Sequence, residues 1–338
     1  MEKLHIRKDG RAGRITFTRP QALNALDHEM ALAVTRALND WRDDPQVELV
    51  LIDAEGDRAF CAGGDIAAIY HAGRAGDFAA GAGFFADEYR MNALIAEYPK
   101  PVVAFMHGFV MGGGVGVGGH ASHRIVGDST RIAMPESGIG LIPDVGGSWL
   151  LAHAPGRMGE YLTLTGARMG PGDAIAAHFA DTYLPEAQWP ALKEKLAETG
   201  DVGLIVGAPP PEAPIAGADL SAYGGRDLAA IVRAVNASGD KDGDAAKALA
   251  RNSPLSMAAG LALVRAARAD DSVRDALARE YRFTSRAAEF GDFLEGVRAQ
   301  IIDKDRQPRW RHAGAGDVTK DEVDAMLAPL GPNELWKE

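Results

Sequence analysis

Two acidic residues that could transfer protons stand eight positions apart in an apolar block of the sequence. Glu136 and Asp144 lie in the block 134–147, where their neighbours include Met, Ile, Leu and Val. A carboxyl group in such surroundings loses hydration, which raises its pKa and permits acid or base chemistry at neutral pH. Two structural alternatives remain open: Asp144 as the N-cap of a helix containing Trp149, and Glu136 as a solvated turn residue.

Two glycine-rich turns could present backbone N–H groups to a ligand. One contains Gly63-Gly64 after an apolar run, and the other is the triple glycine at 112–114. Glycine allows a ligand to approach the backbone closely, and amides at the start of a helix have no partner within that helix. Such amides suit a developing oxyanion. An ordinary tight turn, or close packing of a helix on a sheet, explains the same glycines without a ligand.

Other chemistries find less support in the sequence. Residues 114–119 match G-x-G-x-x-G, but the acidic residue expected about 20 positions later is missing, because Asp128 comes too early for a dinucleotide site. Neither an H-E-x-x-H motif nor paired Cys/His spacing occurs, so a metal site is not indicated. A G-x-S-x-G elbow is also missing. Nothing near Cys61 would lower its thiol pKa, so a nucleophilic role is not expected.

The elements that would position these residues alternate between strands and helices. The helix expected after Asp27 places its apolar residues near a 3.6-residue period. Strands are predicted at 13–18, 47–53, 101–106, 125–126 and 131–133. This alternation predicts an α/β core with crossover connections.

The last third of the sequence has a helical pattern that follows a segment rich in Pro and Gly. Ser253-Pro254 is a plausible N-cap and first residue of a helix that reaches Arg268, and Asp292 with Glu295 resembles a capping box. We therefore predict a core at 1–206, a Pro/Gly-rich loop or linker at 207–220, and a helical C-terminal region at 221–338 that packs on the core.

Composition narrows the class of protein. The 338 residues carry a formal charge of −11, which disfavours nucleic acid as a partner. The single cysteine excludes an intrachain disulfide and fits a reducing compartment. The first residues show no apolar signal segment, and the uncharged stretch 102–119 contains seven glycines, so neither secretion nor a membrane span is expected. A cytoplasmic location is the expectation.

Taken together, these segments resemble the crotonase (enoyl-CoA hydratase/isomerase) superfamily. The matching strings are 19–20, 23–26, 59–66, 111–114, 135–147 and 164–166, in agreement over about residues 10–185. The resemblance implies an α/β fold, a spiral of repeated ββα units, and an oxyanion hole formed by the amides of Gly64 and Gly113. It also implies that the backbone of Ala62, Gly63, Asp65 and Ile66 lies along the adenine and pantetheine of coenzyme A.

Within the superfamily, the chain most resembles the 3-hydroxyisobutyryl-CoA hydrolase branch, through the segments 84–89, 134–147, 292–298, 302–305 and 308–310. This likeness implies that Glu136 and Asp144 are catalytic and that Glu88 contacts the acyl part of the substrate. Hydratases of the superfamily carry a second glutamate where this chain has Gly116. Asp144 stands where hydratases usually have glycine. A hydratase that needs two glutamates is therefore disfavoured.

The expected activity is hydrolysis of a short 3-hydroxyacyl-CoA thioester, 3-hydroxyisobutyryl-CoA foremost, as in valine catabolism. The expected partner is this small molecule, with coenzyme A as part of the substrate and no separate cofactor. Glu136 would attack the carbonyl to form an anhydride or would activate water, and the sequence does not decide between them. The alternatives are another crotonase reaction, such as that of a hydratase or isomerase, a non-catalytic acyl-CoA binding protein, and a dinucleotide oxidoreductase. The oligomeric state is open, a homo-oligomer included.

Overall fold

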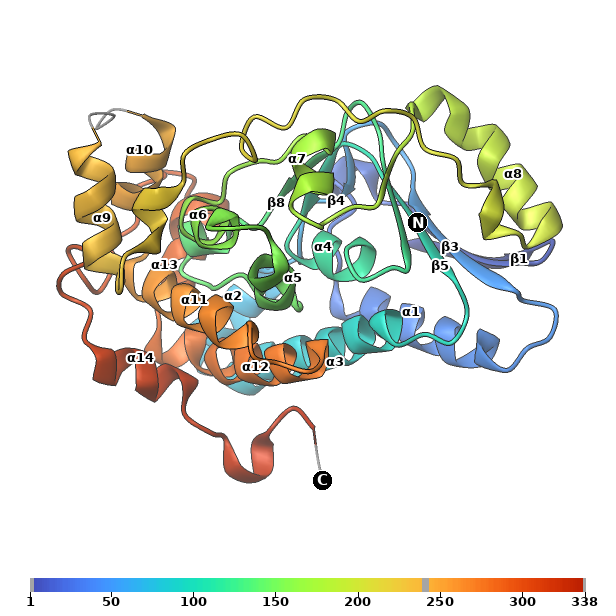
Figure 1. The fold of residues 1–338 in the computed structure, drawn as a ribbon. Helices are drawn as coiled ribbons and strands as arrows, with labels where there is room; N and C mark the ends of the chain where they lie inside the picture. Colours follow the sequence, from blue (N-terminus) through green and yellow to red (C-terminus); the bar gives the residue numbers. More distant parts are fainter. Residues whose placement is uncertain (1–2, 239–242, 337–338) are drawn as a thin grey trace. The chain divides into compact units, whose positions relative to one another are not determined.

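The computed structural model describes residues 3–238 and 243–336 (Figure 1). The chain divides into two compact units. The first unit comprises Met1–Gly64, Arg90–Ala133 and Arg168–Gly217, and the second comprises Asp65–Tyr89, Met134–Ala167 and Ala218–Glu338. Both units therefore draw on separate stretches of sequence. The chain leaves the first unit for the last time after Gly217, inside the segment predicted as a linker. Residues 205–220 form neither helix nor strand. The predicted division at 206 and 221 stays a prediction.

The first unit contains two β-sheets. Their strands are β1 (Leu4–Asp9), β2 (Ala12–Phe17), β3 (Leu49–Ala54), β4 (Ala59–Cys61), β5 (Val102–Met106), β6 (Phe109–Met111), β7 (His123–Val126), β8 (Arg131–Ala133) and β9 (Thr182–Tyr183). The larger sheet has the order β1-β2-β3-β5-β7-β9, and the smaller has the order β4-β6-β8. Among the strands that the structure describes, β1 and β2 pair antiparallel and the other neighbouring strands pair parallel. Successive pairs β3/β4, β5/β6 and β7/β8 each give one strand to each sheet, which confirms the predicted α/β class with repeated ββ units.

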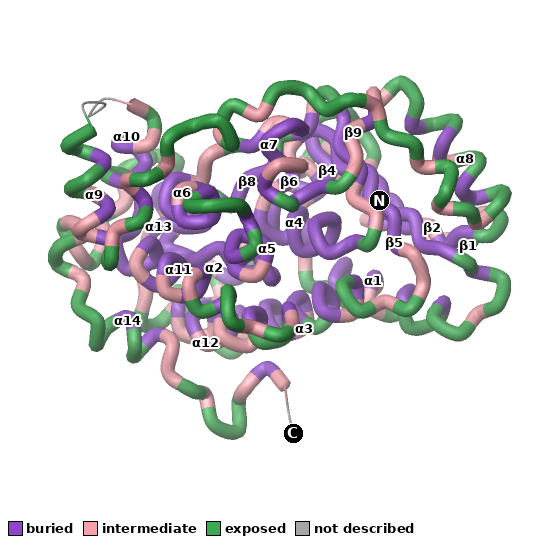
Figure 2. The backbone as a smooth tube through the Cα atoms, viewed as in Figure 1, coloured by how far each residue is buried: buried purple, intermediate pink, exposed green. Residues whose placement is uncertain are grey.

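The helices of the first unit follow from local sequence signals. They are α1 (His28–Arg42), the end of α3 (Phe78–Ala96) from Arg90 on, α4 (Gly113–Gly118), α7 (Pro171–Ala176) and α8 (Trp189–Thr199), with short 3-10 turns η1 (Pro20–Ala22), η3 (Glu186–Gln188) and η4 (Val202–Leu204). Asp27 caps α1 by accepting a hydrogen bond from the Met30 amide, as predicted. Trp189 and Leu196 of α8 pack on buried residues of the large sheet, Phe105 among them. α4 is buried along its whole length (Figure 2).

The regular elements that the structure describes in the second unit are all helices or short helical turns. It contains α2 (Ala67–Arg74), the first half of α3 (Phe78–Ala96), η2 (Glu136–Ile139), α5 (Gly147–His153), α6 (Met158–Thr165), η5 (Ser221–Gly224), α9 (Leu228–Ala237), α10 (Asp244–Arg251), α11 (Pro254–Ala267), α12 (Val273–Phe290), α13 (Phe293–Val297), the π-helical η6 (Arg298–Ile302), α14 (Lys320–Leu327) and η7 (Gly331–Asn333). α11 packs against α5, α6, α12 and α14. It begins with the predicted cap, in which the Ser253 hydroxyl accepts from the Ser256 amide.

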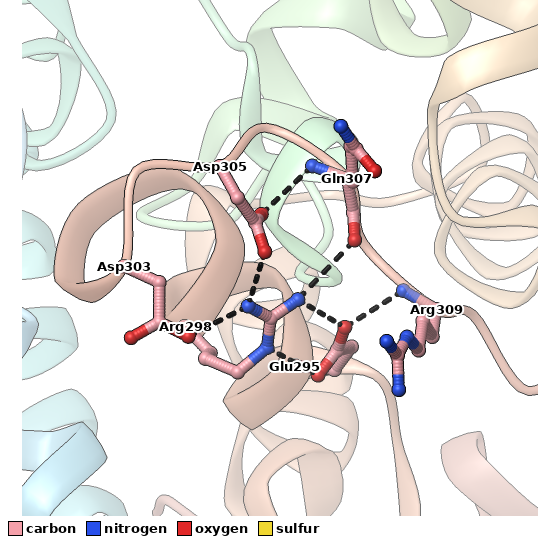
Figure 3. A network of polar contacts seen from close by, with 6 residues as sticks. All are labelled: Glu295, Arg298, Asp303, Asp305, Gln307 and Arg309. Carbon is pink, nitrogen blue, oxygen red and sulfur yellow. Dashed lines mark hydrogen bonds and ion pairs between the residues drawn. The ribbon is translucent and has the colours of Figure 1, made fainter.

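The capping box predicted for Asp292 and Glu295 is wrong. Asp292 does precede α13, but its side chain accepts hydrogen bonds from the Ser253 hydroxyl and the Arg311 amide. Glu295 instead accepts from Arg298, whose guanidinium also bonds two later aspartates, Asp303 and Asp305 (Figure 3). Asp292 and Glu295 have the three-residue spacing of a capping box. Their carboxylates nevertheless bind other partners in place of the amides at the start of α13.

Candidate active site

The two glycine turns of the first unit lie at the same edge of its smaller sheet. β4 and β6 are adjacent parallel strands, in register at Ala59 and Phe109. Gly64 follows the end of β4, and Gly113 follows the end of β6. Because neighbouring parallel strands end at one edge, the topology brings both glycines to that edge.

The backbone around these glycines is closely packed and has free amides. A Cβ atom on Gly114 would lie 2.0 Å from the carbonyl oxygen of Cys61, so close helix–sheet packing explains that glycine. Gly63 has a φ of +107°, which L side chains rarely adopt. Within residues 3–238 and 243–336, the amides of Gly64 and Gly113 donate to no acceptor. Such donors suit an oxyanion, and this role stays a prediction.

The other backbone positions expected along coenzyme A have different surroundings. The Ala62 amide donates to the carbonyl of Leu23, and the Gly63 carbonyl accepts from Leu26, so this segment is fixed by a neighbouring loop. Asp65 belongs to the second unit, where Ile66 is the residue before α2. The role of these residues in binding coenzyme A stays a prediction.

Four buried carboxyl groups of the second unit interact electrostatically and form one cluster. Glu136, Asp144, Glu88 and Glu280 are 6%, 4%, 2% and 0% exposed, respectively. Glu136 begins η2, Asp144 lies in the turn before α5, Glu88 lies on α3 and Glu280 on α12. Both predicted catalytic residues are therefore buried side chains of one unit, and the predicted substrate-binding Glu88 belongs to the same unit.

Hydrogen bonds distinguish two of these carboxyl groups from the other two. Asp144 Oδ2 accepts a 2.7 Å hydrogen bond from the Tyr89 hydroxyl. Glu280 accepts from the amides of Gly146 and Ser148, at 2.7 and 2.9 Å, and from the Ser148 hydroxyl. By contrast, Glu88 Oε1 and Glu136 Oε2 are buried without a hydrogen-bond partner among the described residues. These two oxygens are therefore available to a bound molecule.

Burial dominates the electrostatics of the cluster. It raises the pKa of Glu88 and Glu136 well above the usual range, and the negative charge of Asp144 raises both further. Burial also raises the pKa of Asp144 to about 7 and that of Glu280 to about 7, although hydrogen bonds from Tyr89 and Ser148 oppose this. The main influences on these pKa values are burial, the neighbouring carboxyl groups and hydrogen bonds. All four carboxyl groups of the cluster therefore have a raised pKa, which for Asp144 and Glu280 is about 7.

The helices after residue 250 hold the Glu136 turn in place. The Ser253 amide donates to the carbonyl of Ser137 at 2.9 Å. A Cβ atom on Gly296 of α13 would lie 2.1 Å from the carbonyl oxygen of Ile139, so only glycine allows this close approach. Gly140, with a φ of +73°, ends η2 in the left-handed region. The turn that carries Glu136 is therefore fixed from both sides by backbone contacts.

The structural alternatives for the two acids do not describe this site. α5 begins after Gly146 with no side-chain cap, so Asp144 is not its N-cap. Glu136 is buried, so it is not a solvated turn residue.

Sequence reasoning missed Tyr89, Glu280 and Thr284, although one signal was present. On α12, Glu280 and Thr284 fall on the apolar stripe formed by residues such as Leu277 and Ala287. A charged residue on the buried face of an amphipathic helix requires a specific polar partner.

In the part of the chain that the structure describes, no helix has both the length and the apolar character that a membrane span requires. No group of three or more His, Cys, Asp or Glu side chains in residues 3–238 and 243–336 is arranged to hold a metal ion.

Comparisons with known proteins agree over almost the whole chain. A family model described as Enoyl-CoA hydratase/isomerase matches residues 12–327. The protein named "3-hydroxyisobutyryl-CoA hydrolase, mitochondrial" from Gallus gallus is 35% identical over 98% of this chain and 90% of its own length. The protein of the same name from Danio rerio is 36% identical over 97% of this chain and 90% of its own length.

Two crystal structures are similar in both fold and sequence. That of an enoyl-CoA hydratase from Rhodobacter sphaeroides 2.4.1 has a TM-score of 0.94 and 52% identity, covering 99% of this chain and all of the other. That of a carnitinyl-CoA dehydratase from Mycobacterium thermoresistibile has a TM-score of 0.94 and 40% identity, covering 99% of each chain.

Proposed function

Because the chain belongs to the enoyl-CoA hydratase/isomerase family, we propose that it hydrolyses a short 3-hydroxyacyl-CoA thioester. The substrate we put first is 3-hydroxyisobutyryl-CoA, whose hydrolysis in valine catabolism gives 3-hydroxyisobutyrate and free coenzyme A. The observation that carries this proposal is Asp144, buried in one cluster with Glu136 and Glu88, in a chain about 35% identical to proteins named for this hydrolysis. The cytoplasmic location stays a prediction, and the two relatives are named as mitochondrial.

In the proposed reaction, the thioester carbonyl oxygen accepts hydrogen bonds from the amides of Gly64 and Gly113. Each such donor stabilises a tetrahedral oxyanion by about 3–4 kcal/mol. Ionised Glu136 either attacks the carbonyl carbon, expelling the coenzyme A thiolate and leaving an anhydride, or removes a proton from an attacking water. In the first route, water then cleaves the anhydride and regenerates the carboxylate.

The remaining carboxyl groups of the cluster recognise the substrate hydroxyl in this proposal. Burial raises the pKa of Glu88, and in its protonated form Glu88 can donate a hydrogen bond through its unpartnered oxygen. Ionised Asp144 can accept one from the 3-hydroxyl or from water. A site with buried polar groups discriminates strongly against acyl chains that lack the matching hydroxyl.

The test is thiol release from 3-hydroxyisobutyryl-CoA, with isobutyryl-CoA as the matched substrate that lacks only the hydroxyl. We expect release from the first and little from the second, and a loss of about a hundredfold or more in Glu136→Gln. The control is Glu212→Gln, an exposed glutamate in the 205–220 loop. An acyl-CoA binding protein would instead bind the ligand with no release in any variant. Single-turnover hydrolysis in ¹⁸O-water separates the two routes, since label in Glu136 rejects the simple general-base route.

A second candidate, hydration of an enoyl-CoA, is favoured by the 52% identity to the Rhodobacter sphaeroides protein. Against it, position 116 is a buried glycine of α4, where hydratases of the family carry their second glutamate. Crotonyl-CoA distinguishes the two activities. A hydratase would consume its enoyl absorbance without releasing thiol.

A further inference from the structure

A chain of hydroxyl groups leads away from Asp144 within the second unit. The Tyr89 hydroxyl lies 2.7 Å from Asp144 Oδ2 and 3.2 Å from the Thr284 hydroxyl. The Thr284 hydroxyl in turn lies 3.4 Å from the carbonyl oxygen of Tyr281, one turn earlier on α12. All four residues are buried, at 9% exposure or less.

This chain satisfies Asp144 both with and without its proton. When Asp144 is ionised, Tyr89 donates to Oδ2, and Thr284 donates to the carbonyl of Tyr281. When Asp144 is protonated, Oδ2–H can donate to Tyr89, which then turns its own proton toward Thr284. A hydroxyl both donates and accepts, so every member keeps a partner in both states. A buried donor without an acceptor would disfavour one of the two states.

We propose that Tyr89 and Thr284 form a reversible hydroxyl relay that lets Asp144 hold or release a proton during turnover without leaving a buried polar group unpaired. The inference deepens the proposed function, on which the catalytic part of it rests. Tyr89 and Thr284 are positioning residues in this scheme, because they act through Asp144. They also fix the orientation of its carboxyl group through the hydrogen bond at Oδ2.

Other ionisable groups near Asp144 act on its proton as well. They are Glu88 and Tyr89 from α3, Glu136 from η2 and Glu280 from α12. The three glutamates are carboxyl groups, so any negative charge on them opposes ionisation of Asp144. None of them has a position in the hydroxyl chain, so variants of Tyr89 and Thr284 change the relay without adding or removing a carboxyl group.

The relay predicts opposite shifts for two single-hydroxyl variants. Tyr89→Phe removes the donor to ionised Asp144, so the pH midpoint of Asp144 should rise. Thr284→Val removes the acceptor that Tyr89 needs when Asp144 is protonated, so the midpoint should fall. Each shift should be roughly one pH unit, the size expected for one hydrogen bond to the charged carboxylate in Tyr89→Phe and for one buried donor left unpaired in Thr284→Val. Thr284→Ser keeps the hydroxyl and should restore the original midpoint.

The midpoint is measured by infrared pH-difference spectra of the protonated carboxyl band that Asp144→Asn removes, and in parallel by the pH profile of thiol release. Tyr223→Phe is the matched control, a buried tyrosine of the same unit packed among apolar side chains. It should leave the midpoint unchanged. If Thr284→Val does not fold, Thr284→Ala removes the same hydroxyl and carries the same expectation.

The two assays separate the relay from the proposed function. Opposite midpoint shifts without any thiol release would support the relay and overturn the hydrolase assignment. Thiol release combined with unshifted midpoints, or with shifts in the same direction, would overturn the relay. A fall in kcat at an unchanged midpoint would indicate a purely structural role for the two hydroxyls and would also overturn it.

Discussion

Ionised Asp144 should destabilise the folded protein, and Asp144→Asn can measure this cost. In the folded chain, burial raises the pKa of Asp144 to about 7, against an ordinary value of 3.8 in the unfolded chain. The folded form therefore binds the proton more tightly than the unfolded form does. This contribution favours folding fully below about pH 4 and is lost as the pH rises toward about 7. The shift of about three pKa units corresponds to about 4 kcal/mol.

Urea unfolding followed by tryptophan fluorescence can detect this change. Asparagine keeps the shape of the side chain and can still accept the hydrogen bond from Tyr89, but it does not ionise. From about pH 5 to about pH 8, the free energy of unfolding of Asp144→Asn should rise by about 3 kcal/mol relative to that of the original protein, because this part of the Asp144 titration falls between the two pH values. The variant should be inactive under the proposed function while being relatively more stable at high pH.

Glu160→Gln provides a control with the opposite electrostatics in the same unit. Burial alone would raise the pKa of Glu160, but hydrogen bonds from Arg268 and Arg157 lower it. Its stabilising contribution is present above the unfolded pKa and is lost only as the pH falls through the folded pKa. Removing it should therefore cost nearly the same at both pH values. If the difference between Asp144→Asn and the original protein were also the same at both, the reasoning on Asp144 would be refuted.

Three further predictions concern the same two units. Gly114→Ala should destabilise the protein by about 1–3 kcal/mol in thermal unfolding, because its Cβ would overlap the backbone of Cys61, whereas Gly83→Ala, with nothing within 4 Å, should be neutral or mildly stabilising. The rate of thiol release should rise with pH, and the midpoint of this rise should lie well above the ordinary carboxyl pKa, because Glu136 must ionise and burial raises its pKa. A midpoint near pH 4 would contradict this. In Glu280→Gln, the side chain has one acceptor oxygen fewer for the amides of Gly146 and Ser148, which follow Asp144. Because Asp144 is then held less firmly, steady-state kinetics should show a larger fall in kcat than change in KM.

The sequence predicted those elements whose signals are local. Asp27 and Ser253 cap their helices through amides three residues later, and this geometry depends on a few consecutive residues. The buried strands at 49–54 and 102–106 were equally visible as apolar runs. Asp292 shows the limit of such signals. Its partners, Ser253 and Arg311, lie 39 and 19 positions away in the sequence.

The site was predicted in part for the same reason. Glu136 and Asp144 were recognisable because they share a short apolar block and belong to a motif. Tyr89, Glu280 and Thr284 were not, since their importance arises only from contacts made 55 to 195 positions away. The arrangement of the units was hidden as well. Three separate stretches form the second unit, and no local pattern states which stretches pack together.

The C-terminal helices are therefore part of the apparatus that holds the catalytic candidates. Ser253 and Gly296 fix the turn of Glu136, while Glu280 accepts hydrogen bonds from the amides that follow Asp144. Each charged carboxyl group of the cluster raises the pKa of its neighbours, and a loosely held loop would reduce this effect by exposing the groups to water. The backbone contacts made by residues after position 250 prevent that movement. The raised pKa values of Glu136 and Asp144 thus depend on the last third of the chain as much as on the apolar block around them.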